Sequence, residues 1–298
     1  MRRLIPPLAA LLLLTAACAP PRTGTLGPAP AGPSPTTAAA AGPTGTPAPT
    51  PPAPRTPTTA ATTGRPTTSA PTEPDGTLTV QLWFARDRKL APTRRALPAT
   101  VATSRLALIE LAAGPSPAET ATGLTTLVPA GTRVTRIAGG VATLSPPAGF
   151  DAGGAATARL RRAQVVWTLT QFPTVRRVAF APTDSATGRD DYADLLPPIV
   201  VTAPAIGDPV GSPVTVTGTA DVYEATVSVR VLDAAGQEIG TAFTTASCGS
   251  GCRGGYRLDV RYRRATAGPG TIEVYEVSAR DGTRINVVRI PVDLAAGR

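Results

Sequence analysis

The sequence predicts an α+β domain followed by an all-β antiparallel sandwich, both placed behind a long N-terminal tether. Residues 77–183 mix strand patterns with helical patterns, which is typical of a small α+β domain. Residues 198–295 contain seven short strand-like runs separated by turn residues, as in a β-sandwich. Residues 18–76 consist almost entirely of Pro, Thr, Ala, Ser and Gly, a composition that cannot bury a core and predicts a disordered linker.

The α+β segment opens with a predicted strand and a predicted helix. Side chains alternate between the two faces of a strand, and apolar residues alternate here at Leu78, Val80, Leu82 and Phe84. Helical spacing follows over residues 102–113, with Thr103 or Ser104 as the expected N-cap and Gly114 as the stop. The expected apolar stripe of this helix is Ala102, Leu106, Ile109 and Ala113.

The second half of this segment predicts a hairpin, a helix and a last strand. Gly139 and Gly140 lie between two apolar runs and suit the positive φ angles of a tight turn. A helix is predicted over residues 155–172, ending before Pro173. Its expected apolar stripe is Leu160, Ala163, Trp167 and Thr170. With a last strand over residues 175–180, the predicted order is β-α-β-β-α-β.

Four motifs in this segment carry a family resemblance: residues 108–115, residues 127–132, residues 140–144 and, most specifically, Ala163 to Pro173. They resemble the GerMN domain of sporulation and spore germination proteins. The resemblance implies a fold similar to the ring-building modules of secretion and sporulation machines, which act by self-association or partner binding. Thr143 stands where that family often has an acidic residue, so no role of such an acid is carried over.

The expected sandwich follows a charged connector at residues 184–197, which contains Asp190, Asp191 and Asp194. Three of its stretches, residues 212–220, 223–227 and 274–282, resemble the immunoglobulin-like domain of bacterial spore germination. A GerMN domain followed by this sandwich on a lipoprotein is similar to an architecture of Gram-positive envelopes, including those of non-sporulating actinobacteria.

The N-terminus predicts export. Arg2 and Arg3 precede a short apolar run, and small residues lead to Cys18, which is the pattern of a signal peptide over residues 1–17. The segment from Leu14 to Cys18 resembles the bacterial lipobox, so we expect Cys18 to carry a lipid that holds the chain to the outer face of the cell membrane. The alternative is an ordinary cleavage site that releases a free secreted protein.

The other two cysteines, Cys248 and Cys252, are separated by a short Gly-Ser-Gly spacer. Export places them in an oxidising compartment, which favours a disulfide between them. A metal site would need more ligands, and the chain contains no histidine to supply them. We therefore expect no metal and no other cofactor.

Catalysis is not expected either. With no histidine the chain lacks the commonest general base near neutral pH, and Lys89 is its only lysine. The acidic cluster of the connector is interpreted as a solvated linker. Glu224 and Glu276 lie in corresponding Tyr-Glu motifs and are expected to form a structural pair or a partner contact. The alternative function is a peptidoglycan-modifying enzyme that uses these two carboxylates.

The formal net charge is +9, and all but one of the 29 basic side chains are arginines. Arginine doublets and the two glutamates are the candidate partner-binding residues: Arg161, Arg162, Arg176, Arg177, Glu224 and Glu276. Nucleic acid is not an expected partner outside the membrane, because no stacking aromatics alternate with these arginines. The sequence thus predicts a non-enzymatic envelope lipoprotein that binds a protein partner, peptidoglycan or copies of itself.

Overall fold

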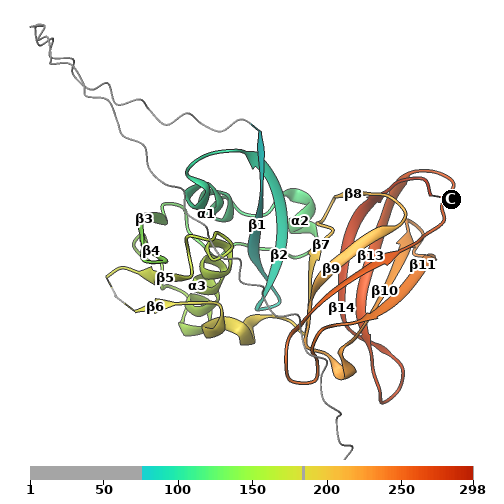
Figure 1. Ribbon diagram of the computed structural model, residues 1–298. Coiled ribbons are helices and arrows are strands. Elements are labelled where there is room, and N and C mark those ends of the chain that lie inside the picture. Colours follow the sequence, from blue (N-terminus) through green and yellow to red (C-terminus); the bar gives the residue numbers. More distant parts are fainter. Residues whose placement is uncertain (1–75, 183–184, 298) are drawn as a thin grey trace, which may run out of the picture. The chain divides into compact units, whose positions relative to one another are not determined.

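A computed structural model describes residues 76–182 and 185–297 (Figure 1). The predicted signal peptide, Cys18 and nearly all of the predicted linker lie outside these residues. Among the described helices, none is long and apolar enough to cross a membrane. The chain forms an α+β part and an all-β part in the predicted order, which confirms the fold class.

The α+β part contains two strands, β2 and β6, and one short helix, α2, that were not predicted from the sequence. Its elements are β1 (Thr77–Arg86), β2 (Lys89–Pro98), α1 (Thr103–Ala113), α2 (Pro117–Ala121), β3 (Arg133–Ala138), β4 (Val141–Ser145), α3 (Ala155–Leu169), β5 (Arg177–Phe180) and β6 (Ala186–Thr187). β1 and β2 form a separate antiparallel hairpin, while the other four strands form a sheet in the order β3-β4-β5-β6. The predicted Gly139-Gly140 turn joins β3 to β4.

Strand β2 was not predicted from the sequence for two physical reasons. Pro92 lies within it opposite Trp83, where a proline is tolerated because β2 is an edge strand. Its turn residues are Asp87 and Arg88, which both take positive φ angles although neither is a glycine. The usual hairpin signal is therefore missing from the sequence.

Helices α1 and α3 pack between the hairpin and the four-stranded sheet (Figure 1). For α1 the predicted stripe is wrong: the buried residues are Ser104, Ala107, Leu108 and Leu111, whereas Ile109 is 55% exposed. The helix is apolar on most sides, so residue spacing alone did not select the buried face. The predicted N-cap is also wrong, since Ala102 occupies that position without a side-chain cap.

Helix α3 is buried on both sides, and polar side chains of the helix and of Gln171, just beyond its end, bond to the free edge of β1. Gln171 Oε1 accepts from the Gln81 amide at 2.9 Å, and Gln171 Nε2 donates to the Gln81 carbonyl at 2.7 Å. Thr168 Oγ1 accepts from the Trp83 amide at 3.0 Å, and Gln164 Nε2 donates to the Trp83 carbonyl at 3.2 Å. Three side chains at helical spacing thereby replace the strand that β1 lacks on this side.

The predicted connector folds as part of the α+β part, which corrects its interpretation as a solvated linker. A 3₁₀ helix, η1 (Asp190–Leu195), buries Tyr192 in the same core as α3. Arg159 of α3 makes a two-point ion pair with Asp194, with both N···O distances 2.7 Å. The hydrogen bonds from Arg159 hold the pKa of the Asp194 carboxyl below its usual value.

The all-β part is a sandwich of two sheets. Its strands are β7 (Ile199–Ala203), β8 (Pro209–Val210), β9 (Val214–Ala220), β10 (Thr226–Asp233), β11 (Glu238–Thr245), β12 (Gly254–Val260), β13 (Gly268–Val277) and β14 (Arg284–Leu294). One sheet has the order β11-β10-β13-β14-β8 and the other β12-β9-β7. All seven predicted runs are strands, and only the two-residue β8 was missed. Alternate residues of both sheets, such as Val227 and Val229 of β10 and Val216 of β9, fill the core.

The predicted disulfide is present. Cys248 and Cys252 are bonded, with their Cα atoms 5.7 Å apart. The loop that they close holds the neighbouring turn, because Ser250 donates its amide to the Val222 carbonyl and Gly251 donates its amide to Asp221 Oδ1. The disulfide therefore stiffens one end of the sandwich.

Candidate binding surfaces

Three carboxylates are buried in the described residues, and they are the natural candidates for acid or base catalysis: Glu119, Glu273 and Glu276. A catalytic carboxylate needs a free oxygen and access to substrate. Each of the three instead has hydrogen-bond donors on both of its oxygens. Their contacts therefore decide whether the interior holds a reactive site.

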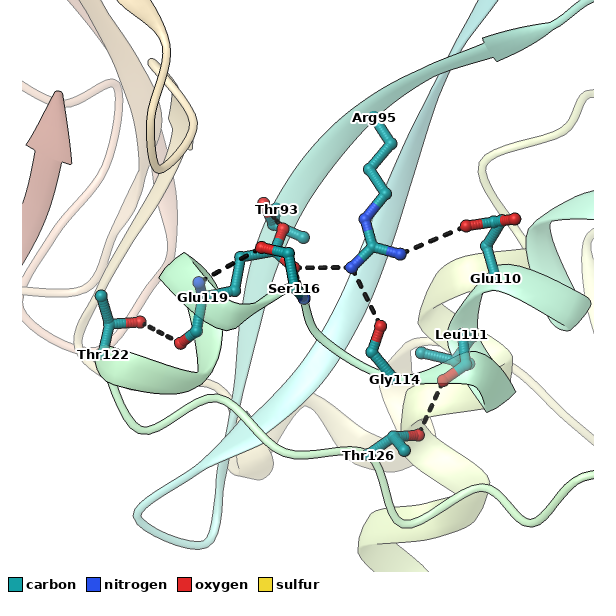
Figure 2. Close-up of polar contacts among 9 residues, drawn as sticks. All are labelled: Thr93, Arg95, Glu110, Leu111, Gly114, Ser116, Glu119, Thr122 and Thr126. Atoms are coloured by element: carbon teal, nitrogen blue, oxygen red, sulfur yellow. Dashed lines mark hydrogen bonds and ion pairs between the residues drawn. The ribbon is translucent and has the colours of Figure 1, made fainter. Parts of the chain in front are cut away.

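Glu119 is the centre of the network drawn in Figure 2. One of its carboxylate oxygens accepts from Thr93 at 2.8 Å, and the other accepts from Arg95 and from the Ser116 amide, both at 2.6 Å. Arg95 also contacts Glu110 at 3.2 Å. Ser116 and Glu119 form a capping box at the start of α2. The network fastens β2 to the turn between α1 and α2.

Competing effects act on the pKa of Glu119. Burial works to raise it, but hydrogen bonds from Ser116, Arg95 and Thr93 together hold the pKa below its usual value. The carboxylate is therefore charged and saturated at neutral pH. Its role is to hold the fold.

Glu273 has the same character on the outer face of the larger sandwich sheet. Arg230 on β10 donates to one oxygen at 2.6 Å, and Arg289 on β14 donates to the other at 2.7 Å. Burial works to raise the pKa of Glu273, while the two arginines hold it below its usual value. The triad ties three adjacent strands together.

Glu224 and Glu276 are not brought together as a pair. Glu276 is buried and accepts from the Tyr223 amide at 3.0 Å and from Asn286 Nδ2 at 2.7 Å. Glu224 is exposed on the turn η2 (Tyr223–Ala225) and has a positive φ of 51°. The expected contact between the two carboxylates does not occur among the described residues, although the residue next to Glu224 does bond to Glu276.

The candidate arginines fall into two groups. Arg161 is only 8% exposed and donates to the carbonyls of Leu127, Phe150 and Ala152, so it holds loops together and offers no guanidinium to a partner. The other three lie nearer the surface. Arg162 pairs with Asp151 at 2.8 Å, while Arg176 and Arg177 donate to the carbonyls of Gly139 and Ala186.

An aromatic row on the outer face of the larger sandwich sheet was not predicted from the sequence. Phe243 on the edge strand β11 pairs with Ser228 on β10, and Ser228 pairs with Tyr275 on β13. Directly paired residues share one face of a sheet. Phe243 is 76% exposed, whereas Tyr275 is 8% exposed and has the Arg284 guanidinium 5.5 Å from its ring centroid. A period-two pattern in β11 was the available signal, but it did not show which face was covered.

Residues 76–182 and 185–297 hold no group of three or more Cys, Asp or Glu side chains placed to bind a metal ion. The large exposed apolar side chains are instead distributed over both parts of the chain: Val101, Ile109, Ile137, Tyr223, Phe243, Val277 and Ile285. These exposed apolar side chains provide surface on which another molecule can pack.

We predict that Glu119→Gln lowers the free energy of unfolding by about 2 kcal/mol at neutral pH, because Arg95 loses its buried anionic partner. Glu110→Gln, which removes the more exposed partner of Arg95, should cost less than about 1 kcal/mol. The folded-state pKa of Glu119 lies below its usual value of 4.5, so its stabilisation is complete above that pH and is lost as the pH falls through the folded-state pKa.

Urea unfolding of the native chain and both variants at neutral pH and at about pH 3 measures these differences. The gap between the native chain and Glu119→Gln should narrow at the lower pH. A gap that is unchanged between the two conditions would show that the ionised carboxylate does not stabilise the fold.

Comparison with known protein families gives two matches. Residues 66–181 match a family described as sporulation and spore germination, and residues 198–283 match the immunoglobulin-like domain of bacterial spore germination. The first match begins eleven residues before β1 and ends one residue beyond β5. The comparison with curated proteins gives no match.

Solved structures give weaker similarities. The first GerMN domain of the sporulation protein GerM from Bacillus subtilis is 22% identical, with 36% of this chain and 86% of that chain covered and a TM-score of 0.30. The tandem GerMN domains of GerM are 18% identical, with 62% of each chain covered and a TM-score of 0.34. The aligned part therefore spans less than two thirds of the tandem structure.

The two family matches follow each other in the order expected from the sequence, and one lies in each folded part of the chain. The chain thus carries a sporulation and spore germination domain, followed by an immunoglobulin-like domain of bacterial spore germination.

Proposed function

We propose that this chain is a non-catalytic binding protein of the cell envelope, held to the outer face of the membrane by a lipid on Cys18. Its two domains contact a protein partner, peptidoglycan or further copies of the chain. The observation that carries the proposal is the saturation of Glu119, Glu273 and Glu276 by structural hydrogen bonds. The two matched families, which are named for sporulation and germination, support it.

The aromatic row is the surface that we assign to a protein partner. Phe243 projects from an edge strand beside the half-buried Ser228, and Tyr275, which is 8% exposed, lies next to Ser228 on the same face. Exposed aromatic side chains contribute much of the energy at protein interfaces. Arg284 beside Tyr275 adds a cation to the same face.

The rival function, a peptidoglycan-modifying enzyme, requires two free carboxylates on either side of a sugar linkage. Glu276 is buried with both oxygens bonded, and Glu224 is exposed and makes no contact with it in the described chain. This geometry favours binding over hydrolysis. Purified sacculi whose turnover by this protein is lost in Glu276→Gln, with the fold intact, would establish the enzyme instead.

The lipid anchor is tested at Cys18. We expect Cys18→Ser to abolish incorporation of labelled palmitate and to move the protein from the membrane fraction to the medium, because one thioether-linked diacyl group accounts for stable anchoring. Cys248→Ser with Cys252→Ser is the matched control, since it removes two cysteines and should leave the labelling unchanged. Unlabelled native protein would show that the chain is secreted free of lipid.

The protein-binding surface is tested by placing a photo-crosslinking amino acid at Phe243 in intact cells. The matched control carries the same group at Arg257, which is exposed on β12 of the other sheet. We expect a discrete protein adduct at position 243 that is missing at position 257. Phe243→Ser should then reduce co-purification of that same protein by about tenfold or more, as loss of a central aromatic anchor does.

Equal adducts at both positions, or none at position 243, would show that the aromatic row is not the binding surface. Binding of the native chain to sacculi alone, unaffected by Phe243→Ser, would assign the partner to the wall.

A further inference from the structure

A pocket of about 560 Å³ lies in the first domain, where four segments of the chain meet. Its lining residues come from the tip of the β1–β2 hairpin, from the loop that follows α2, from the first turns of α3 and from the end of η1. Pockets of this size hold small molecules in many proteins. The pocket is therefore a candidate ligand site, and it belongs to a different domain from the aromatic row.

The pocket has an apolar wall to which each of the four segments contributes one residue: Ala85, Leu127, Leu160 and Leu195. Leu127 and Leu195 are half-buried and pack against the core of the domain. The wall is held in place by backbone hydrogen bonds, because Ala85 and Thr125 each donate an amide to the carbonyl of the other at 2.8 Å. A fixed apolar wall favours a ligand with an apolar body.

The charged lining residues lie at the hairpin tip and on α3. Arg159 of α3 is neutralised by its two-point ion pair with Asp194. In contrast, the guanidinium groups of Arg86 and Arg88 make no hydrogen bond and no ion pair within residues 76–182 and 185–297. Asp87 is the only carboxylate among the described residues that line the pocket. The lining therefore keeps a positive charge that the described chain does not balance.

Arg86 is the less exposed of these two cations, since it is half-buried whereas Arg88 is exposed. Burial lowers the pKa of the Arg86 guanidinium, and the negative charge of Asp87 offsets this effect only in part. A cation that is partly removed from water without a hydrogen-bond acceptor is costly. The turn next to it is also strained, because Asp87 and Arg88 have φ angles of 50° and 60°. Strain of this kind is found most often at functional sites.

We infer that this pocket binds an amphipathic anion, a molecule with an apolar chain of about ten carbons and a carboxylate or phosphate head. The head supplies the acceptors that Arg86 and Arg88 lack, and the chain lies against the apolar wall. Guanidinium groups bind both kinds of head through paired hydrogen bonds. Free fatty acids carry a carboxylate and membrane lipids carry a phosphate, so the same chemistry has two sources. The inference goes beyond the proposed function, since it assigns a small ligand to the first domain.

Calorimetric titration of the full-length chain with decanoate tests the site. The chain carries Cys18→Ser, so that no detergent is needed and no acyl group of its own competes. We expect saturable binding that weakens about tenfold with octanoate, which buries two methylene groups fewer. Uncharged decanol should bind about tenfold more weakly than decanoate, because it cannot form charge-assisted hydrogen bonds. Decyl phosphate then separates the two sources: the anion that binds more tightly identifies the head group.

A blocked pocket tests the place of binding. Ala156 is exposed on α3 and lines the pocket, so Ala156→Phe should fill it and abolish binding of decanoate. The matched control is Ala155→Phe, because Ala155 is an equally exposed neighbour on the same helix that does not line the pocket. We expect this control to retain native affinity.

The role of the cations is tested by charge removal. Arg86→Gln with Arg88→Gln should remove the preference for decanoate over decanol, and Arg88→Gln alone, at an exposed position, should reduce that preference about threefold. Arg257→Gln with Arg261→Gln removes equal charge on and after β12 and should leave the preference unchanged. Unchanged thermal unfolding of each variant shows that the fold is retained.

Three results would overturn the site. The first is the lack of saturable binding of both anions. The second is an equal loss of affinity in Ala155→Phe and Ala156→Phe, and the third is an equal loss of preference in the two arginine pairs, which would reduce the effect to general charge attraction. None of these results bears on the crosslinking at Phe243, so the two proposals fail separately.

Discussion

The free edge of β1 is the constraint on which the first domain depends. A strand that pairs on one side only leaves amides and carbonyls that must be satisfied, and here that side faces the interior. Gln164 and Thr168 of α3, together with Gln171 just beyond its end, supply the missing partners at the spacing of one helix face. Because these side chains reach into the core, α3 must be buried on both sides. The hairpin, the helix and the sheet are thereby fixed in one layer order.

The same rule governs the charged groups of the interior. Arg161 is surrounded by carbonyl oxygens, Glu119 by three donors, and Glu273 by two arginines. Burying a charge is costly unless its hydrogen bonds are replaced, and these networks replace them. A group that is saturated in this way is not free to transfer protons. These buried charged groups therefore stabilise the fold.

Much of the fold follows from local sequence patterns, because these patterns depend only on interactions between residues that are close together in the chain. The alternation from Leu78 to Phe84 and the Gly139-Gly140 pair specify a strand and a turn through side-chain direction and positive φ angles. The disulfide of Cys248 and Cys252 follows from a short spacer. These features need no knowledge of distant residues, and the structure contains all of them.

What escaped prediction depends on distant partners. Polar residues in α3 resemble a solvated face until β1 is placed beside them, and Arg161 resembles a surface cation until the Leu127 and Phe150 carbonyls surround it. The buried face of α1 and the exposure of Phe243 depend likewise on which neighbours cover them. The aromatic row arises from strand pairing, which no single segment encodes.

Hydrogen exchange at the Trp83 amide measures the central claim most directly. Thr168→Val keeps the shape of the side chain but removes the oxygen that accepts from this amide. The account predicts that Trp83 exchanges as slowly as the buried strand β4 in the native chain and much faster in the variant, while the amides of β9 are unaffected. Fast exchange at Trp83 in the native chain, or equal rates in both proteins, would contradict it.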